Sequence, residues 1–502
     1  MSRHFLTILS AFILSSTIVS AQEVTPKDVM RYNESDLNGT ARFKAMSGAF
    51  GALGGDLSAL RINPAGGAIF NYNTAAFSLS FVNKDNKSNY LGQKKSDDYN
   101  GLDLGQLGAL FVFKSNNPNA VMKKFTIGLN YESTKNLRNN YIFQGTSDNN
   151  SLGDYFLQTA NNSATPFDAV APTDYTYGYD RAGALYGYAG QQTYLATHSN
   201  LISKTNKDGV YSGNYLTDTP MLQTRELYTT GYTGQFSGNF AAQLGDRFYV
   251  GANLNVHTVD YTQDSRASQV AGKEYIHYDN YLYTYGTGFS FNLGAIAQIT
   301  NEFRAGLAYQ SPTWYSLNDE LTQGVATVLS DGTSNAVYPY IVNTYDKYKL
   351  RTPSKYTGSL AYVFGDKGLL SVDYTIKDYS NNEFRPKWDG TYALLNEIAS
   401  NEMKTASELR IGGEYRIKQF SLRGGYRYEQ SPYKNIKYVG DLNSFSLGLG
   451  YDFGASRVDI SYAHTTRDSK TSLIDMPINN LYSNANIKSK ENWINVTYNI
   501  NF

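Results

Sequence analysis

The chain ends in the sequence WINVTYNINF, residues 493–502, and this stretch decides the fold class. Apolar and polar side chains alternate along it; the apolar set is Ile494, Val496, Tyr498, Ile500 and Phe502, and the polar set is Asn495, Thr497, Asn499 and Asn501. A period of two is typical of a β-strand with one apolar and one polar face. The sequence therefore predicts a sheet that separates an apolar from a polar environment.

The same alternation recurs along the chain and predicts about fourteen strands. We expect them near residues 72–82, 104–113, 123–134, 226–243, 247–261, 283–299, 303–315, 350–364, 368–378, 405–417, 419–430, 443–453, 456–466 and 491–502. A tilted strand of roughly ten to twelve residues crosses an apolar layer of about 25 Å. One missed or additional hairpin would change the count to about twelve or sixteen.

The connections between these segments alternate in length. Those after even-numbered strands are short, as at 244–246 and Lys418, whereas those after odd-numbered strands are long, as at 83–103 and 262–282. Tight periplasmic turns and long extracellular loops give a membrane barrel this asymmetry, and an even strand number places both barrel ends on the periplasmic side. We therefore predict an all-β fold, a closed antiparallel transmembrane β-barrel formed by residues 72–502.

The first residues have the pattern of a cleaved signal peptide. An apolar run at 5–19 leads into Val19-Ser20-Ala21, so we expect residues 1–21 to be removed and Gln22 to begin the mature chain. No later stretch approaches the roughly 18 apolar residues of a spanning helix, so the membrane must be crossed by strands. The chain has 44 Lys and Arg against 44 Asp and Glu, which argues against a nucleic-acid partner. It has no Cys, which excludes a lipid-anchored cysteine and disulfides.

Residues 22–71 do not alternate, and their middle part is rich in small side chains. The run 45–56 is followed by Asn63-Pro64-Ala65-Gly66-Gly67. Small residues permit close packing, and Asn-Pro favours a turn. A lumen of about fourteen strands is wide enough to leak unless it is filled. We therefore expect residues 22–71 to form a small hatch inside the lumen.

This segment resembles the hatch signature of the FadL/TodX (OmpP1) family of outer-membrane transporters of hydrophobic molecules. The residues that carry the resemblance are Asp56, Ser58, Ala59 and the hatch motif Asn63, Pro64, Ala65 and Gly66. The C-terminal Phe502 agrees with the same family, whose barrels end in an aromatic residue that the barrel insertion machinery reads.

The resemblance implies a protein of the bacterial outer membrane that takes up hydrophobic small molecules passively, such as long-chain fatty acids. The ligand would be captured by extracellular loops, bound in the lumen and released sideways through the wall. We expect partners of three kinds: a hydrophobic small-molecule ligand, outer-membrane lipid and, during assembly, the insertion machinery. We expect a monomer without a cofactor or metal and, since no catalytic motif is found, no enzymatic activity.

Two arginines are candidate ligand-binding residues. A two-residue turn at Lys418-Gln419 would place Arg410 opposite Arg427, with both side chains facing the lumen. Two like charges in direct opposition are destabilising unless an anion lies beside them, so the pair could hold an acyl carboxylate. The alternative is a structural charge ladder in which Glu408 and Glu429 neutralise both arginines.

Two other functions remain open at this point. A FadL-like barrel could act as a protein-interaction or secretion-system shuttle subunit through its long loops, including the Tyr-rich loop at 135–225. Such aromatic loops could capture a hydrophobic ligand or could equally pack against themselves. An open hydrophilic porin is the third possibility, although a water-filled channel gains nothing from a hatch.

Overall fold

The computed structural model of the chain describes residues 26–34, 36–117, 119–217, 220–435, 438–475 and 481–502. The predicted signal peptide, residues 1–21, and the predicted first mature residue, Gln22, lie outside the described residues.

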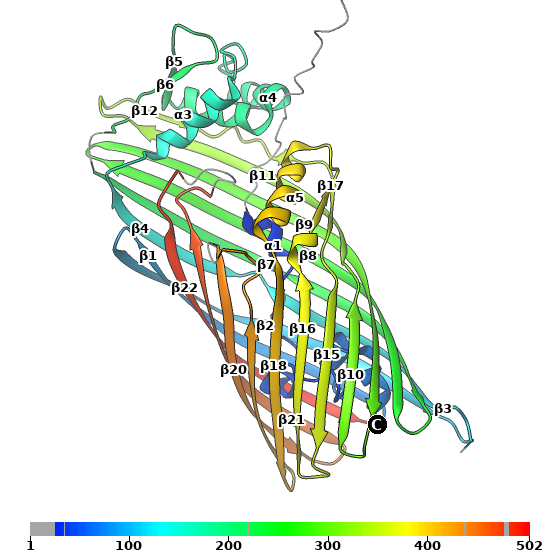
Figure 1. Cartoon of the computed structure of the whole chain (residues 1–502). Helices are drawn as coiled ribbons and strands as arrows, with labels where there is room; N and C mark the ends of the chain where they lie inside the picture. The colour runs from blue at the N-terminus through cyan, green and yellow to red at the C-terminus, as the bar shows by residue number, and fades with distance from the viewer. Residues whose placement is uncertain (1–25, 35, 118, 218–219, 436–437, 476–480) are drawn as a thin grey trace, which may run out of the picture.

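One antiparallel sheet of fourteen strands closes on itself as a barrel, so the predicted fold class and strand count are confirmed. The last strand pairs with the first over most of its length, which closes the sheet (Figure 1). In barrel order the strands are β1 (Thr74–Tyr90), β2 (Gln93–Lys114), β3 (Met122–Asn136), β7 (Met221–Leu244), β8 (Phe248–Ala271), β9 (Glu274–Gln298), β10 (Phe303–Gln310), β15 (Lys355–Val363), β16 (Gly368–Asp378), β18 (Thr405–Ile417), β19 (Phe420–Glu429), β20 (Val439–Asp452), β21 (Ser456–Thr471) and β22 (Ala485–Asn501).

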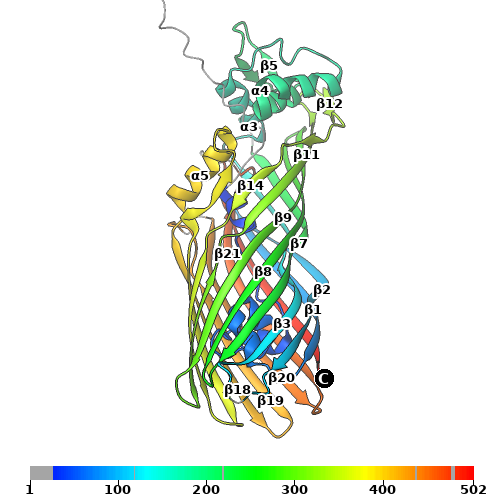
Figure 2. The same ribbon diagram turned by 90° about the vertical axis from the view of Figure 1, so that its right-hand side faces the viewer.

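Further elements continue the wall or cover it at the end away from the C-terminus, as Figures 1 and 2 show. The wall is extended by β4 (Asn139–Ser147), β11 (Trp314–Val328), β12 (Ser334–Val337), β13 (Asn343–Thr344), β14 (Tyr348–Arg351) and β17 (Glu383–Arg385). The covering elements are α3 (Leu152–Ser163), α4 (Tyr175–His198), β5 (Ile202–Lys204), β6 (Tyr211–Gly213), η3 (Tyr379–Asn381) and α5 (Gly390–Glu402). Among the helices of the described residues, none is both long and apolar enough to cross a membrane.

Two of the predicted long loops are wrong. Residues 83–103 continue β1 and β2 up to a tight turn at Leu91-Gly92, and residues 262–282 continue β8 and β9 to a turn at Gly272-Lys273. Beyond the membrane the outward positions of these strands are mostly polar, so the apolar-polar alternation ends although the backbone ladder continues. A prediction from polarity alone therefore ends these strands too early.

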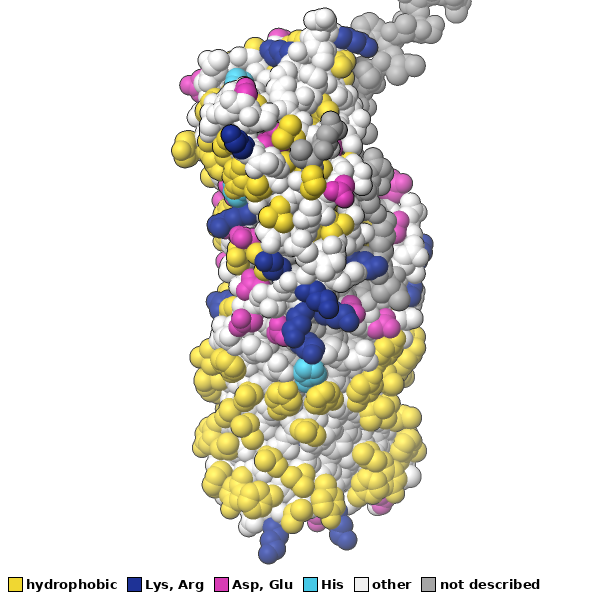
Figure 3. All heavy atoms as spheres, turned by 90° about the vertical axis from the view of Figure 1, so that its left-hand side faces the viewer, with side chains coloured by type: hydrophobic (Ala, Val, Ile, Leu, Met, Phe, Trp, Pro, Cys, Tyr) yellow, Lys and Arg dark blue, Asp and Glu magenta, His cyan; other side chains and the backbone are white. Residues whose placement is uncertain are grey.

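The outer surface of the lower barrel is a continuous hydrophobic band (Figure 3). Its outward side chains are strongly exposed, for example Leu447 at 58% and Val496 at 46%. The polar residues between them face the lumen: Asn495 and Thr497 are almost fully buried. This division of the two strand faces is what an outer-membrane barrel requires, since lipid surrounds the apolar face.

The described part of the hatch fills the lower lumen. It contains four short helices, α1 (Pro26–Arg31), α2 (Ala41–Ala45), η1 (Ser58–Arg61) and η2 (Pro64–Ile69). Its backbone approaches the wall closely at Gly412 and Gly425, where a Cβ atom would lie 2.5 Å from the Met46 carbonyl oxygen and carbon, respectively. Such contacts allow no side chain on the wall, which explains small residues at inward positions of β18 and β19.

The C-terminal residue generates the first prediction. The Phe502 backbone N–H donates to the Asn73 carbonyl oxygen at 3.0 Å, and its exposed ring lies 6.2 Å from that of Phe111. We propose that this lipid-facing ring is also the assembly signal, so deleting Phe502 should reduce the yield of folded barrel while export across the inner membrane continues. Heat-modifiable migration of outer-membrane fractions measures this yield. The substitution Phe453→Ala, which removes an exposed periplasmic ring elsewhere, is the control, and an equal yield for both variants would contradict the assembly role.

Candidate ligand-binding cavity

A cavity of about 360 Å³ lies between the hatch and the upper wall of the barrel. Hatch residues from Met30 to Lys44 border it on one side, and the other walls come from β1, β3, β4, β7, β8, β9, β11, β19, β20, β21 and β22. Its volume falls within the range of about 300–1,000 Å³ typical of small-molecule sites. The size suits a single amphipathic molecule and not a protein segment.

Apolar side chains cover much of the cavity surface. Those from the wall include Leu137, Leu227, Leu282, Leu321, Ile487 and Trp493. They come from strands whose lumen-facing positions are otherwise mostly polar, as at Asn495 and Thr497 of β22. The apolar lining above the hatch therefore departs from the pattern of the lower lumen and provides room for a hydrocarbon.

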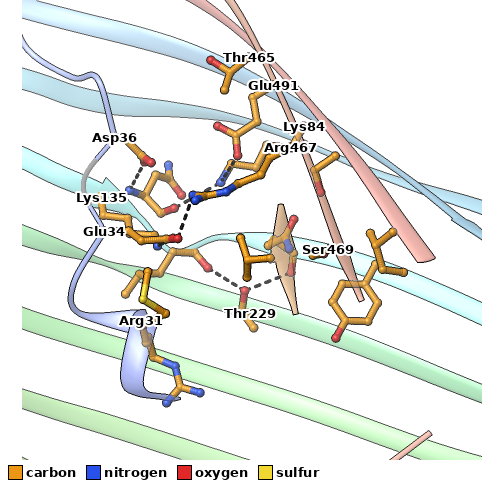
Figure 4. A pocket seen from close by; sticks show the side chains of 18 of the residues that line it. Arg31, Glu34, Asp36, Lys84, Lys135, Thr229, Thr465, Arg467, Ser469 and Glu491 are labelled. Atoms are coloured by element: carbon orange, nitrogen blue, oxygen red, sulfur yellow. Dashed lines mark hydrogen bonds and ion pairs between the residues drawn. The ribbon is translucent and has the colours of Figure 1, made fainter. Parts of the chain in front are cut away.

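Charged residues cross the cavity as ion pairs, several of which Figure 4 shows. Glu34 of the hatch bridges Lys135 of β3 and Arg467 of β21, with the Arg467 Nη1–Glu34 Oε1 distance at 2.8 Å. Burial alone would raise the pKa of Glu34, but the two cations beside it lower that pKa to about 2. Lys84 pairs with Glu491 at 3.1 Å. The Glu34 pairs hold the hatch to β3 and β21, and the Lys84–Glu491 pair joins the neighbouring strands β1 and β22.

Lys44 of α2 is the exception among these charges. It is 2% exposed, and its Nζ lies 3.9 Å from the centre of the Trp493 ring and donates to Asn38 Oδ1 at 3.4 Å. No carboxylate of the described residues lies within ion-pair distance of it. Burial lowers the pKa of its ammonium group to about 7. Lys44 was not singled out from the sequence, although a lysine directly beside the small-residue run of the hatch could have indicated it.

Cations outnumber carboxylates around the cavity. The cations are Arg31, Lys44, Lys84, Lys135, Arg225, Arg427 and Arg467, and the carboxylates are Glu34, Asp36, Asp475 and Glu491. An anion is therefore better matched to this cavity than a cation or a neutral polar molecule.

The predicted arginine pair is present in the predicted register. Arg410 and Arg427 are cross-strand partners around the turn at Lys418-Gln419, and both are buried. Glu408 pairs with both arginines, at 2.6 Å from Arg410 Nη2, and Glu429 accepts from Arg427 Nη2 at 2.8 Å. The structure thus contains the charge ladder that was the alternative. The ligand-binding role of the pair stays a prediction; Arg427 does line the cavity, while Arg410 lines a smaller chamber below it.

Two neighbouring wall strands are interrupted beside this smaller chamber. Ser311-Pro312-Thr313 separates β10 from β11, and Thr352-Pro353-Ser354 separates β14 from β15. Proline has no backbone N–H to donate to the strand ladder, and side-chain hydroxyl groups replace part of the missing hydrogen bonding. The Phe291 N–H donates to Ser311 Oγ at 2.9 Å, and the Thr313 N–H donates to Thr352 Oγ1 at 3.0 Å.

The wall is thin just below these interruptions. The smaller chamber, of about 80 Å³, and a groove of about 550 Å³ on the outer surface share two lining residues, the cross-strand partners Ala308 and Thr357. The outward position beside them is Gly358, next to which a Cβ atom would meet nothing within 4 Å. Glu34 lines both the main cavity and the chamber. The cavity, the chamber and the outer groove are thus neighbouring spaces, separated by Glu34 on one side of the chamber and by Ala308 and Thr357 on the other.

The family profile of the outer membrane protein transport proteins (OMPP1/FadL/TodX) matches residues 232–502, which is more than half of the chain. The chain belongs to this family. No curated protein matches it. A Pseudomonas aeruginosa FadL homologue is 14% identical, with 94% of this chain and 100% of that chain covered and a TM-score of 0.55. The Pseudomonas putida toluene transporter TodX is also 14% identical, with the same coverage and a TM-score of 0.52. At this identity the two structures show the shared fold alone.

Membership of the FadL/TodX family and the barrel fold place the chain in the bacterial outer membrane. The profile match begins within β7, so it does not include the hatch motif. In the structure this motif ties the hatch to the wall. Asn63 Nδ2 donates to the carbonyl oxygens of Gly51 at 2.7 Å and Ala295 at 3.1 Å, and Asn63 Oδ1 accepts from the Ala65 N–H at 3.1 Å.

The other residues of the motif pack around this contact. Pro64 occupies the first turn of η2, where its missing N–H has no partner to lose. Ala65 is fully buried against β8, and a Cβ atom on Gly66 would lie 2.9 Å from the Gly54 Cα. Asn63, Pro64, Ala65 and Gly66 therefore have packing roles in a FadL-like hatch, and none of them lines the main cavity.

The Asn63 contacts generate the second prediction. The substitution Asn63→Ala leaves buried carbonyl groups without a donor, at a cost of about 1–3 kcal/mol. We expect a lower thermal unfolding midpoint and a higher single-channel conductance in planar bilayers, because the hatch is held less firmly. Asn301→Ala in a periplasmic turn is the matched control. Wild-type conductance in the Asn63 variant would contradict the anchoring role.

Proposed function

We propose that this FadL/TodX-family barrel takes up amphipathic molecules with a long apolar part and an acidic head group, such as long-chain fatty acids, across the outer membrane. The observation that carries the proposal is the cavity above the hatch. It combines an apolar lining with an excess of cations, one of which, Lys44, is buried without a carboxylate partner.

Each part of the cavity suits one part of such a ligand. Leucine side chains such as Leu227 and Leu321 would bury the hydrocarbon, and each buried CH₂ group contributes about 0.8 kcal/mol. The carboxylate would lie near Lys44, where it replaces water as the partner of a buried ammonium group. A charge-assisted hydrogen bond of this kind is worth roughly 1.5–3 kcal/mol. Arg427 lies on the same cavity and is a second candidate for the head group.

The proposed release route runs sideways into the membrane. A ligand would pass Glu34 into the smaller chamber and leave between β10 and β15, where Ala308 and Thr357 separate the chamber from the outer groove. A lipid-exposed gap is tolerated only where the freed backbone groups find other partners. The Ser311 and Thr352 hydroxyl groups supply such partners beside the proposed exit.

The third prediction tests the head group. The substitution Lys44→Gln should weaken binding of an ionised fatty acid about ten- to hundredfold, while binding of the corresponding alcohol changes little. Lys44→Arg keeps the charge and should restore much of the affinity for the acid. Titration calorimetry of the detergent-purified variants measures both ligands. Equal losses for acid and alcohol would contradict a carboxylate at Lys44.

The same prediction has a pH dependence. The pKa of Lys44 is about 7 because of its burial, and a bound carboxylate stabilises the charged ammonium group. Affinity for the acid should therefore be highest below pH 7, where Lys44 is already protonated and the ligand is still ionised. Above pH 7 binding must take up a proton, so affinity should fall about tenfold per pH unit. The Lys44→Gln variant should lose this slope, and an unchanged slope would contradict the assignment.

The fourth prediction tests the route. Ala308→Trp places a bulky ring between the chamber and the outer groove, so uptake should fall severalfold while equilibrium binding in the main cavity is retained. Ala305→Trp, on the lipid-facing side of the same strand, is the control. Uptake of radiolabelled fatty acid by cells that express each variant gives the readout. Normal uptake with Ala308→Trp would contradict this exit while leaving the proposed ligand class unaffected.

A further inference from the structure

A group of lysine side chains lies on the outer surface of the barrel directly above the hydrophobic band, as Figure 3 shows. We call this group the lysine patch. Its members are Lys87 of β1, Lys94 of β2, Lys470 of β21, and Lys488 and Lys490 of β22, all of them exposed. The patch lies on the outer side of the wall, where Ser469 and Ile487 line both its groove and the main cavity, and it plays no part in the proposed uptake.

The height of the patch corresponds to the head-group layer of a membrane. Along β22 the outward positions run from Ile494 in the band through Asn492 to Lys490 and Lys488. At about 3.3 Å per residue and a tilt near 40°, the two lysines lie roughly 10–15 Å above Ile494. Lysine stems are flexible and can lower the ammonium group towards the lipid surface. The patch can therefore reach lipid head groups but not the acyl layer.

The neighbours of the patch neutralise it only in part: Asp85 lies opposite Lys490 and Asp468 lies opposite Lys488 across the strands. Lys87 and Lys488 are direct cross-strand partners, an arrangement that is destabilising for like charges. Lys87 has one long contact, 3.8 Å, with Asp85, and the other lysines of the patch form no ion pair with the described residues. The carboxylates on the same face are Asp85, Asp98 and Asp468, so the lysines outnumber them.

The outer surface forms a groove at the lysine patch. The outward charges on another side of the barrel are mainly acidic. A groove of about 870 Å³ is lined by Lys87, Lys94, Lys95, Lys470 and Lys488. Above the band on another side of the barrel, the outward charges of β8, β9 and β11 are mainly acidic: Asp260, Asp264, Asp279 and Glu320, with Arg266 paired to Asp264 at 2.7 Å. The lysine patch on β1, β2, β21 and β22 thus differs in charge from the outward face of β8, β9 and β11.

We propose that the lysine patch binds the phosphate groups of a lipopolysaccharide-type lipid of the outer leaflet. Several ammonium groups around one groove match a phosphorylated head group, because lysine acts as a compact point charge towards phosphate. The hydrophobic band directly below would receive the acyl chains of the same molecule. Phosphate between Lys87 and Lys488 would also relieve their mutual repulsion. The position above an apolar band favours a lipid over a free phosphate ion.

The test compares lipid retention by two variants with equal charge change. The patch variant carries Lys87→Gln, Lys94→Gln, Lys488→Gln and Lys490→Gln. The control variant carries Lys273→Gln, Lys347→Gln, Lys367→Gln and Lys418→Gln, four exposed positions in turns and loops elsewhere. Both are purified in detergent, checked for heat-modifiable folding, and titrated with bisphosphorylated lipid A, phosphatidylethanolamine or inorganic phosphate in native mass spectrometry.

The proposal expects lipid A adducts on the wild type and the control, and at least a tenfold weaker association for the folded patch variant, since each lysine near an anionic surface contributes roughly fivefold. Equal retention of lipid A by both variants would overturn it. Equal binding of phosphatidylethanolamine, a zwitterionic phosphodiester, and lipid A to the wild type would also overturn it, because the two anionic phosphate groups of lipid A would then make no difference. If inorganic phosphate saturated the patch at the same concentration as lipid A, the ligand would be a free phosphate ion, and the proposal of a lipid ligand would be refuted.

Discussion

The structure depends on hydrogen bonds from the barrel wall to the backbone of the hatch. Strand alternation puts polar or small side chains on most lumen-facing positions of the lower barrel, and the short hatch helices leave many backbone carbonyl groups without partners of their own. Asparagines of the wall meet this need: Asn239, Asn253, Asn292 and Asn495 donate to the carbonyl oxygens of Pro64, Leu60, Arg61 and Gly39 at 2.7–3.0 Å. From the other side, Asp373 accepts the N–H groups of Phe50 and Gly51. An unpaired group in these positions would be costly, so wall and hatch specify one another.

The ligand cavity lies above the hatch core, where these hydrogen bonds between wall and hatch end. Above the hatch core the wall carries leucines and Trp493 at lumen-facing positions, and a few ion pairs replace the dense polar contacts. Ion pairs such as Glu34 with Arg467 stabilise the arrangement without filling the space. An enclosed, partly apolar cavity with a buried ammonium group favours uptake of an amphipathic acid. It gives no support to a barrel that serves only to hold a protein partner, or to an open porin.

The sequence predicted the parts of the fold that depend on local periodicity. Alternation gave the strand number, the turn at Lys418-Gln419 and the opposition of Arg410 and Arg427, because the side-chain period of a strand is fixed. Alternation did not predict where the strands end beyond the membrane, because the pattern does not continue there. It also left open whether the tyrosines of loop 135–225 capture ligand, and in the structure Tyr179 and Tyr194 pack inside the extracellular cover.

The candidate site was harder to predict than the fold for a physical reason. Leu227 and Arg467 are far in sequence from the hatch residues Glu34 and Lys44, and only barrel closure and hatch insertion bring them to one cavity. The most direct measurement is a crystal structure with a fatty acid brominated at its terminal carbon. The account predicts anomalous bromine density in the cavity above the hatch, with the carboxylate within hydrogen-bond distance of Lys44 Nζ. Bromine density confined to the outer surface, with the cavity empty, would contradict it.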